Sequence, residues 1–225
     1  MRKPDRPLAE APDPAGRPAS GRGRRPPVRE RREIPAGPPP DAASLREAAL
    51  NHLARFSSTE RNLVQVLTRR ISRWAQRAAR EAQPSEQVEA AVARARAAAA
   101  EVAAALVQAG VVDDAAFAAA RTRRLARAGR SRRATAAHLA TKGIDADLAA
   151  QTLEAAETDE LTAALTHLRR RRQGPFARVD APDEAARLKA MGSLARAGFP
   201  REVAERALDT DPAEAEAHIL ASRRD

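Results

Sequence analysis

The sequence predicts an all-α protein made of small helical modules in tandem. Three observations support this class. Apolar residues recur every three or four positions, and nothing alternates with the period of two that strands require. Aromatic residues make up only 2% of the 225 residues and tyrosine is absent, which disfavours a β-sandwich or barrel. The third observation is an internal repeat in which a helix ends at a glycine.

Residues 1–40 are predicted to form a disordered arm rich in proline and arginine. The segment holds 11 of the 16 prolines, with 10 basic and 5 acidic residues and almost no apolar side chains to bury. No apolar stretch follows Arg2 and Lys3, so we expect no secretory signal and a cytoplasmic protein. Two interpretations stay open: a basic arm that concentrates a polyanion near the protein, or a dispensable tail.

Order is expected to begin near Asp41. Two sequences, Ser44-x-x-Glu47 and Ser57-x-x-Glu60, match the capping box, in which the two side chains satisfy free backbone donors at a helix start. After the second one, apolar residues at helical spacing predict one buried helix face. These residues are Leu63, Val66, Leu67, Ile71 and Trp74.

A further helix is predicted over residues 86–108, after the Pro84-Ser85 pair. Asp113 is expected to cap the next helix, which carries Phe117 and Leu125. From there to residue 225 we expect helices that alternate with short turns.

The internal repeat determines the expected architecture. Residues 139–153 align without gaps on residues 194–208, and residues 106–111 resemble the first part of both. In each copy a leucine precedes the glycine by four positions and an apolar residue follows it, which is the pattern of a Schellman helix end. The glycines are Gly110, Gly143 and Gly198, and new helices are expected to start at Asp145 and Pro200. The repeating unit is therefore helix, glycine turn, helix.

Charge suggests a polyanionic partner. The formal net charge is +10, from 40 basic and 30 acidic residues. Three blocks contain bases and no acid: six arginines at 61–80, seven arginines and Lys142 at 115–144, and five arginines at 161–179. Such a surface fits nucleic acid or an assembly that contains it.

The second block is the preferred binding surface. Its arginines fall on the end of one helix and on the start of the next, where free backbone N–H groups also favour anions. The alternative is a solvated face whose arginine stems cover apolar neighbours. For the run 169–172 the two interpretations carry equal weight, because four consecutive arginines point all around a helix. The full set of candidates is Arg121, Arg123, Arg124, Arg127, Arg130, Arg132, Arg133, Lys142, Arg169, Arg170, Arg171 and Arg172.

Nothing in the sequence indicates an enzyme. Cysteine is absent, which excludes disulfides, a thiol nucleophile and a zinc ribbon. The four histidines stand alone, and the only glycine-rich sequence, Gly21-Arg-Gly23, follows no strand. Asp113-Asp114 is explained by helix capping. We therefore expect no catalytic residue, no metal site and no cofactor.

With these residues in view, the chain resembles the RecX family, bacterial regulators of the RecA recombinase. The resemblance rests on residues 109–118, on residues 130–144, on Gln173-Gly-Pro-Phe176 and on residues 194–199, and it covers roughly 45–208. The last of these motifs is similar to the version in alphaproteobacterial members. A departure is that the helix through Trp74 runs on without the glycine that usually ends it in the family.

The resemblance implies three tandem three-helix modules in an elongated, curved arrangement. They would span 41–112, 113–157 and 158–208, followed by a tail or helix at 209–225. It also implies a monomer that binds the groove of the RecA–DNA filament and inhibits ATP hydrolysis, strand exchange and SOS activity, with DNA itself as a second partner. The alternative hypothesis is an independent basic helical DNA-binding protein without a recombinase partner.

Overall fold

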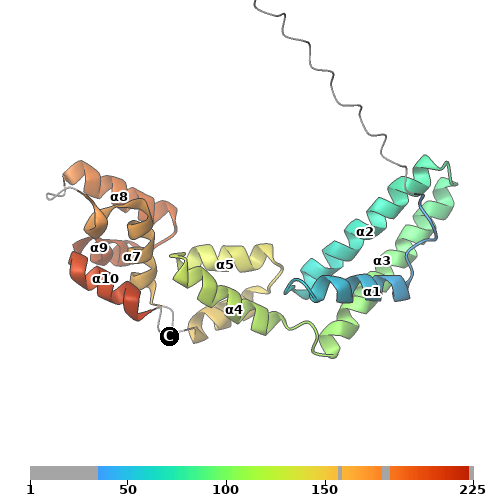
Figure 1. Cartoon of the computed structure of the whole chain (residues 1–225), viewed down its shortest axis with the longest axis horizontal. Coiled ribbons are helices and arrows are strands. Elements are labelled where there is room, and N and C mark those ends of the chain that lie inside the picture. Colours follow the sequence, from blue (N-terminus) through green and yellow to red (C-terminus); the bar gives the residue numbers. More distant parts are fainter. Residues whose placement is uncertain (1–34, 157–158, 179–182, 223–225) are drawn as a thin grey trace, which may run out of the picture. The chain divides into compact units, whose positions relative to one another are not determined.

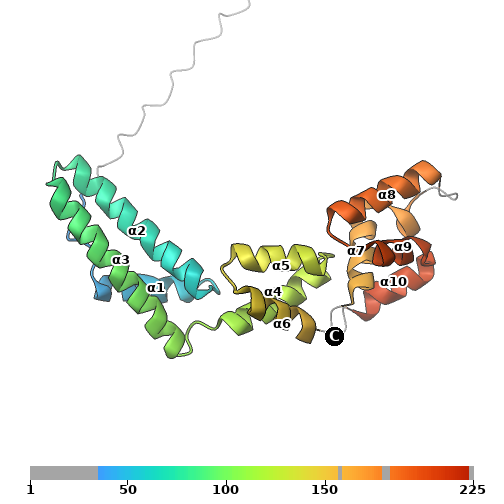
Figure 2. The same cartoon turned by 180° about the vertical axis from the view of Figure 1, so that it is seen from behind.

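The computed structural model describes residues 35–156, 159–178 and 183–222. Within them the chain forms ten α-helices and one short 3₁₀ turn, η1 (Gly174–Phe176), and no strand (Figure 1, Figure 2). The all-α prediction is confirmed. The predicted disorder of the arm lies outside the described residues as far as position 34.

The first group of helices is α1 (Ala42–Leu53), α2 (Glu60–Arg80) and α3 (Ser85–Gln108). The apolar face predicted for α2 packs into its core, although Val66 is only half-buried. The facing residues of α3 include three alanines at four-residue spacing, whose small side chains let the two long helices approach closely. They are Ala95, Ala99 and Ala103.

Both predicted capping boxes start at the wrong residue. The N-cap of α1 is Asp41, whose carboxylate accepts from the N–H of Ser44 at 2.8 Å, so Ser44 is the third helical residue. The N-cap of α2 is Thr59, two positions after Ser57. Thr59 is fully buried, and its tertiary hydrogen bond makes it the better cap.

Residues 35–40 pack on the first helix group, which differs from the expected start of order at Asp41. Ala36 is buried, and its N–H donates to a carboxylate oxygen of Glu81 at 2.7 Å. The indole N–H of Trp74 donates to the carbonyl of Gly37 at 3.1 Å. A buried indole needs such an acceptor, and the end of the arm supplies it.

The second group is α4 (Asp114–Arg127), α5 (Arg132–Thr141) and α6 (Ala146–Ala155). Its small core is built on Leu139 and Ile144, and Asp113 and Asp145 cap α4 and α6 as expected. The third group is α7 (Glu160–Arg171), α8 (Glu184–Arg196), α9 (Arg201–Asp209) and α10 (Pro212–Ala221). Here α7 is the central helix, because residues 161–166 are all buried.

The predicted glycine turns are confirmed. Gly143 and Gly198 have φ of +83° and +87°, and in both turns the next N–H bonds to the carbonyl five residues back. Gly110 repeats the arrangement with φ +67°. The missing glycine after α2 is explained by Ala82, which takes the left-handed conformation itself with φ +55°.

The repeat extends to the contacts between helix groups. The hydroxyl of Thr59, the N-cap of α2, donates to the carbonyl of Lys142 at the end of α5 at 2.6 Å. The hydroxyl of Ser131, the N-cap of α5, donates to the carbonyl of Ala197 at the end of α8 at 2.7 Å. Each cap thus ties the start of one helix to a glycine turn of the next group.

The same two helix starts bind an acid from the following group. The N–H of Glu60 donates to Asp114 at 2.9 Å, and the N–H of Arg132 donates to Glu160 at 3.1 Å. A carboxylate at a helix N-terminus is favoured by the free N–H groups and the helix dipole. The two junctions therefore share one design, and the second one lies beside the predicted binding residues.

Candidate nucleic-acid interface

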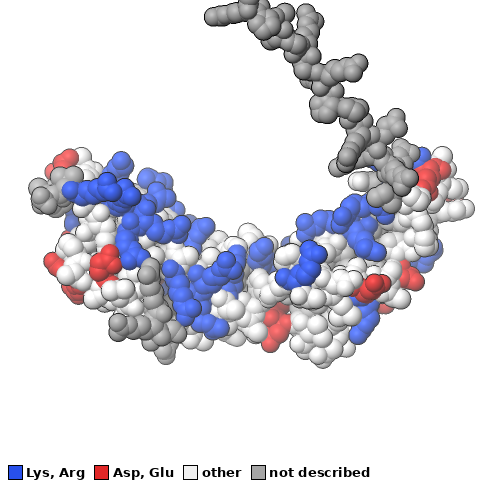
Figure 3. Space-filling model, in the orientation of Figure 1, with Lys and Arg blue, Asp and Glu red and all other residues white. Residues whose placement is uncertain are grey.

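The predicted arginines of the second block lie on the end of α4 and around the start of α5. Arg123, Arg124 and Arg127 are exposed on the last turns of α4. Basic residues are also favoured there by the helix dipole, so their position alone does not separate binding from stability. Arg132 and Arg133 are exposed in the first turn of α5, and Figure 3 shows basic side chains gathered over this part of the molecule.

Arg130 is held beside the third helix group by the turn that precedes it. Gly129 ends α4 in the left-handed conformation, with φ +74°. A Cβ on Gly129 would lie 2.9 Å from the backbone nitrogen of His167 in α7. Because only glycine permits this approach, the turn lies directly on α7, and Arg130 emerges next to the arginines of that helix.

Two of the predicted residues bind side chains of the protein itself. Arg121 donates from Nε to Nε2 of His138 at 2.9 Å. Burial, followed by the charges of Arg121, Lys142 and Arg130, lowers the pKa of His138, so a neutral ring accepts this bond. Arg169 forms an ion pair with Glu216 of α10 at 3.0 Å.

Two more predicted residues lie at helix ends. Arg172 caps α7 in a left-handed conformation with φ +53°. Lys142 is half-buried at the end of α5, where its carbonyl accepts from Thr59. The structure thus distributes the twelve candidates between one surface and several structural contacts.

A basic pocket of about 550 Å³ lies between the second and third helix groups. Three predicted arginines line it, Arg130, Arg170 and Arg171, together with Arg196 of α8. Arg170 also donates to the carbonyl of Ala128 at 2.9 Å. Arg196 was not among the predicted binding residues, although the stretch 185–201 around it also contains basic residues and no acid.

His167 forms part of the wall of this pocket. Its Nε2 lies 3.1 Å from the hydroxyl of Ser193, and its ring meets the edge of Phe199. Burial lowers the pKa of His167, and the nearby charges of Arg171, Arg170 and Arg130 lower it further. The ring is therefore neutral near pH 7, and the guanidinium groups supply the positive charge.

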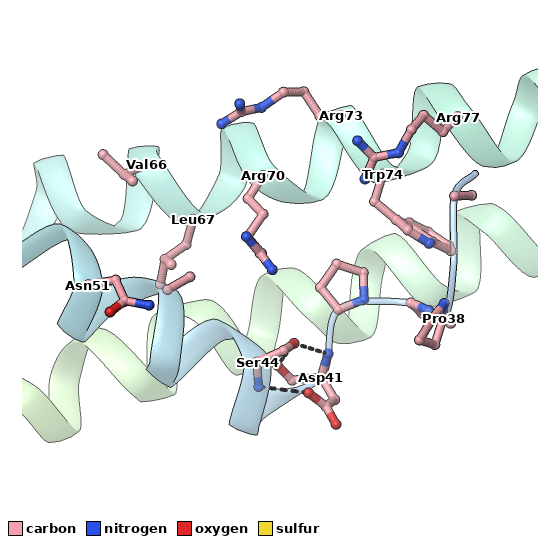
Figure 4. Close-up of a pocket in the computed structure, with 14 residues that line it drawn as sticks. Pro38, Asp41, Ser44, Asn51, Val66, Leu67, Arg70, Arg73, Trp74 and Arg77 are labelled. Atoms are coloured by element: carbon pink, nitrogen blue, oxygen red, sulfur yellow. Dashed lines mark hydrogen bonds between the residues drawn. The ribbon is translucent and has the colours of Figure 1, made fainter. Parts of the chain in front are cut away.

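A second pocket, of about 650 Å³, lies in the first helix group. Arg70, Arg73 and Arg77 of α2 line it with Trp74 and Pro38. In Figure 4, Arg70 extends from α2 toward the start of α1. The first basic block was the sequence signal for this pocket, although its arginines were not among the predicted binding residues.

An exposed apolar surface lies around the last turn of α1. Leu50, Phe56 and Val111 are 41%, 51% and 49% exposed, and they line a groove of about 540 Å³ with residues of α4. Large exposed apolar side chains that cluster in this way are typical of protein-contact surfaces.

Metal-binding and membrane-spanning features are absent from the described part of the chain. Among residues 35–156, 159–178 and 183–222, no three His, Cys, Asp or Glu side chains are grouped so that they could hold a metal ion. None of the helices described there is both long enough and apolar enough to span a bilayer.

Comparisons with known proteins agree with these helices. A family model described as the second three-helix domain of RecX matches residues 113–153, which hold α4, α5 and most of α6. A protein of Myxococcus xanthus (strain DK1622) named "Regulatory protein RecX" is 33% identical over 172 residues, which cover 75% of this chain and 86% of that protein. A "Regulatory protein RecX" of Agrobacterium fabrum (strain C58 / ATCC 33970) is 36% identical over 105 residues, or 47% of this chain and 55% of that protein. The chain belongs to the RecX family of regulatory proteins.

Proposed function

We propose that this RecX-family protein binds the RecA–DNA filament and lowers its ATP hydrolysis and strand exchange. It acts as a regulator and not as an enzyme. The observation that carries the proposal is the placement of arginines on the ends of α4, α7 and α8 and the start of α5, in a chain related over three quarters of its length to a regulatory protein RecX. Such a surface attracts a polyanion from a distance and holds it by charge-assisted hydrogen bonds.

A filament presents both DNA phosphates and protein, and the chain offers a surface for each. The arginines around the start of α5 suit phosphates, and the apolar groove with Phe56 suits a protein surface. Simultaneous use of both surfaces would make the assembled filament a better ligand than either component, because the second contact forms within one complex. We propose three modules as the units of this binding, the first of which starts at residue 35, with boundaries near 112 and 157.

The test is RecA ATPase on single-stranded DNA with increasing amounts of this protein. We expect ATP hydrolysis to fall at micromolar protein or below. The variant Arg123→Glu, Arg127→Glu, Arg133→Glu should fold almost normally, since exposed charge changes move stability by no more than about 0.5 kcal/mol each. It should lose inhibition, because each contact to the anionic groove becomes a repulsion.

The matched control replaces Arg2, Lys3 and Arg6 by glutamate, which gives the same change in net charge. If the placement of the arginines matters, the control keeps its inhibition. Equal losses in both variants would show a general cation effect. Full inhibition by the variant of Arg123, Arg127 and Arg133 would place the binding surface elsewhere, with the arginines of 169–172 next.

The second candidate is a DNA-binding protein without a recombinase partner, and the net charge of +10 favours it as well. A protein that binds only phosphates should bind any DNA, and its affinity should fall with salt. The logarithm of the association constant should decrease with the logarithm of the salt concentration, with a slope of about −0.9 per phosphate contacted. A filament regulator should instead prefer the filament to bare DNA and to free RecA. Absence of any ATPase effect would support this second candidate.

A further inference from the structure

We propose that the pocket between α4, α7 and α8 is a phosphate site that holds the backbone of a nucleic-acid strand. Arg130, Arg170, Arg171 and Arg196 provide the four positive charges. This proposal names the place where the chain binds DNA. It rests on the proposed function only in that DNA is a partner.

The charge in this pocket is unbalanced. Among the residues that line it in the described part of the chain, four are arginines and none is acidic. The arginines that form ion pairs within the described residues are Arg169, Arg187 and Arg201, which lie outside the pocket lining. Like charges that share one pocket repel each other, so the pocket is most stable when an anion lies between them. Guanidinium groups match phosphate oxygens in geometry as well as in charge.

The pocket is held in shape before any ligand binds. Arg170 is fixed by its bond to the carbonyl of Ala128, and this neutral acceptor leaves its positive charge uncompensated. The hydroxyl of Ser131 ties the start of α5 to Ala197 at the end of α8. The close approach of Gly129 to α7 fixes the third wall. Preformed geometry lowers the entropy that binding would otherwise lose.

A neighbouring pocket indicates a polymer and not a single small anion. It has a volume of about 350 Å³, is lined by Arg133 of α5, and shares Arg196 and Ala197 with the first pocket. Adjacent basic pockets with a common wall suit a strand that carries one phosphate per nucleotide. Neither pocket is lined by a Phe or Trp among the described residues, and the one aromatic ring in the lining, that of His167, already packs against Phe199, so we expect little stacking of bases. The site would therefore hold the backbone of any sequence.

His167 gives the site a second property that can be measured. The charged groups that face it are Arg130 after α4, Arg170 and Arg171 on α7, and Arg196 on α8. A bound phosphate would offset their repulsion and raise the lowered pKa of His167, so binding should take up protons. Affinity for phosphate should thus increase as the pH falls from the higher pKa of His167 in the complex to its lower pKa in the free protein.

The experiment measures binding of the full chain to a fluorescent single-stranded oligothymidylate without RecA. The variant Arg171→Glu, Arg196→Glu should bind about tenfold or more weakly, because contacts in the pocket become repulsions. The control Arg94→Glu, Arg96→Glu makes the same charge change on the exposed face of α3. It should lose no more than about threefold, through long-range charge alone. Equal losses in the two variants would overturn the proposal.

Folding, ligand chemistry and location are each checked by a separate measurement. Circular dichroism reports folding, and if the glutamate variant unfolds, Arg171→Gln with Arg196→Gln is used with the same expectation of weaker binding. Poly-glutamate of equal charge should compete poorly; competition equal to that of the oligonucleotide would show a carboxylate site and refute the phosphate assignment. Pyrophosphate should shift the amide signals of Gly129 and Arg130, and an absence of shifts at saturation would also refute it. The proton uptake should disappear in His167→Asn.

The outcome is separable from that of the proposed function. Weak oligonucleotide binding by the Arg171/Arg196 variant supports the pocket whether or not the protein inhibits RecA. If the wild-type chain inhibits RecA ATPase but the variant binds the oligonucleotide as tightly as the wild type, the regulatory function is supported and the phosphate site is refuted.

Discussion

Replacement of Thr59 by valine tests the shared design of the two junctions. The Thr59 side chain is fully buried and its hydroxyl makes two bonds: it accepts from the N–H of Asn62 at 3.1 Å and donates to the carbonyl of Lys142 at 2.6 Å. Valine has nearly the same shape, so the substitution removes the hydroxyl and leaves no cavity. Loss of the cap costs about 1 kcal/mol. The abandoned carbonyl, which is half-buried, adds about 1 kcal/mol. We expect the free energy of unfolding to fall by about 2 kcal/mol.

The assay is chemical denaturation followed by circular dichroism, with three variants for comparison. Thr152→Val is the matched control, because its hydroxyl bonds only to the carbonyl four residues back inside α6. That carbonyl keeps its helical partner, so we expect a loss below about 0.5 kcal/mol. Thr59→Ser should restore most of the stability. Ser131→Ala, at the second junction, should lose a similar amount to Thr59→Val. A loss for Thr59→Val no larger than that of Thr152→Val would refute the junction argument.

Three other changes test the turns and the arm. Gly143→Val should lower the melting temperature for two reasons. The left-handed conformation costs a β-branched residue at least about 1–2 kcal/mol, and a Cβ at this position would collide with the side-chain carbons of Arg61. An unchanged melting temperature would contradict this. Ala82→Gly should raise the free energy of unfolding by about 0.5–1 kcal/mol, because glycine adopts a positive φ without strain. A lower free energy of unfolding, measured by chemical denaturation, would show that Ala82 is not strained. A chain that starts at residue 35 should have the melting temperature of the whole protein. A chain that starts at Asp41 should melt at a lower temperature, because it lacks the carbonyl that accepts from Trp74. Equal melting temperatures would show that residues 35–40 contribute nothing to stability.

Local features of the fold could be predicted from the sequence because they depend on residues close together. The Schellman turns at Gly143 and Gly198 need only a glycine, a leucine four positions before it and an apolar residue after it. The cap at Asp113 is equally local. The start of α2 was predicted two residues early, since the choice between Ser57 and Thr59 is decided by a bond to Lys142, 83 positions away.

The candidate site divides in the same way. Arg130, Arg170 and Arg171 were predicted from blocks without acids, and the structure brings them together in one pocket. The loss of Arg169 to an ion pair with Glu216 could not be foreseen, because the partner is 47 positions away on α10. Arg196 was missed although the stretch 185–201 also contains four basic residues and no acid. These residues are spread over two helices, and only the tertiary structure brings Arg196 into the pocket with Arg130 and Arg171.

The turn at 129–131 links the stability of the second junction to the proposed phosphate site. Gly129 brings the turn onto α7, Arg130 extends into the pocket, and Ser131 caps α5 while bonding to α8. A change at Ser131 should therefore weaken phosphate binding as well as folding, because the end of α8 positions Arg196. A change at Thr59 should affect folding alone, since its partner is the turn at Lys142 and the pocket lies at the other junction. If the two substitutions lower the free energy of unfolding equally, a loss of phosphate binding in the Ser131 variant alone would be the contribution of the second junction to binding.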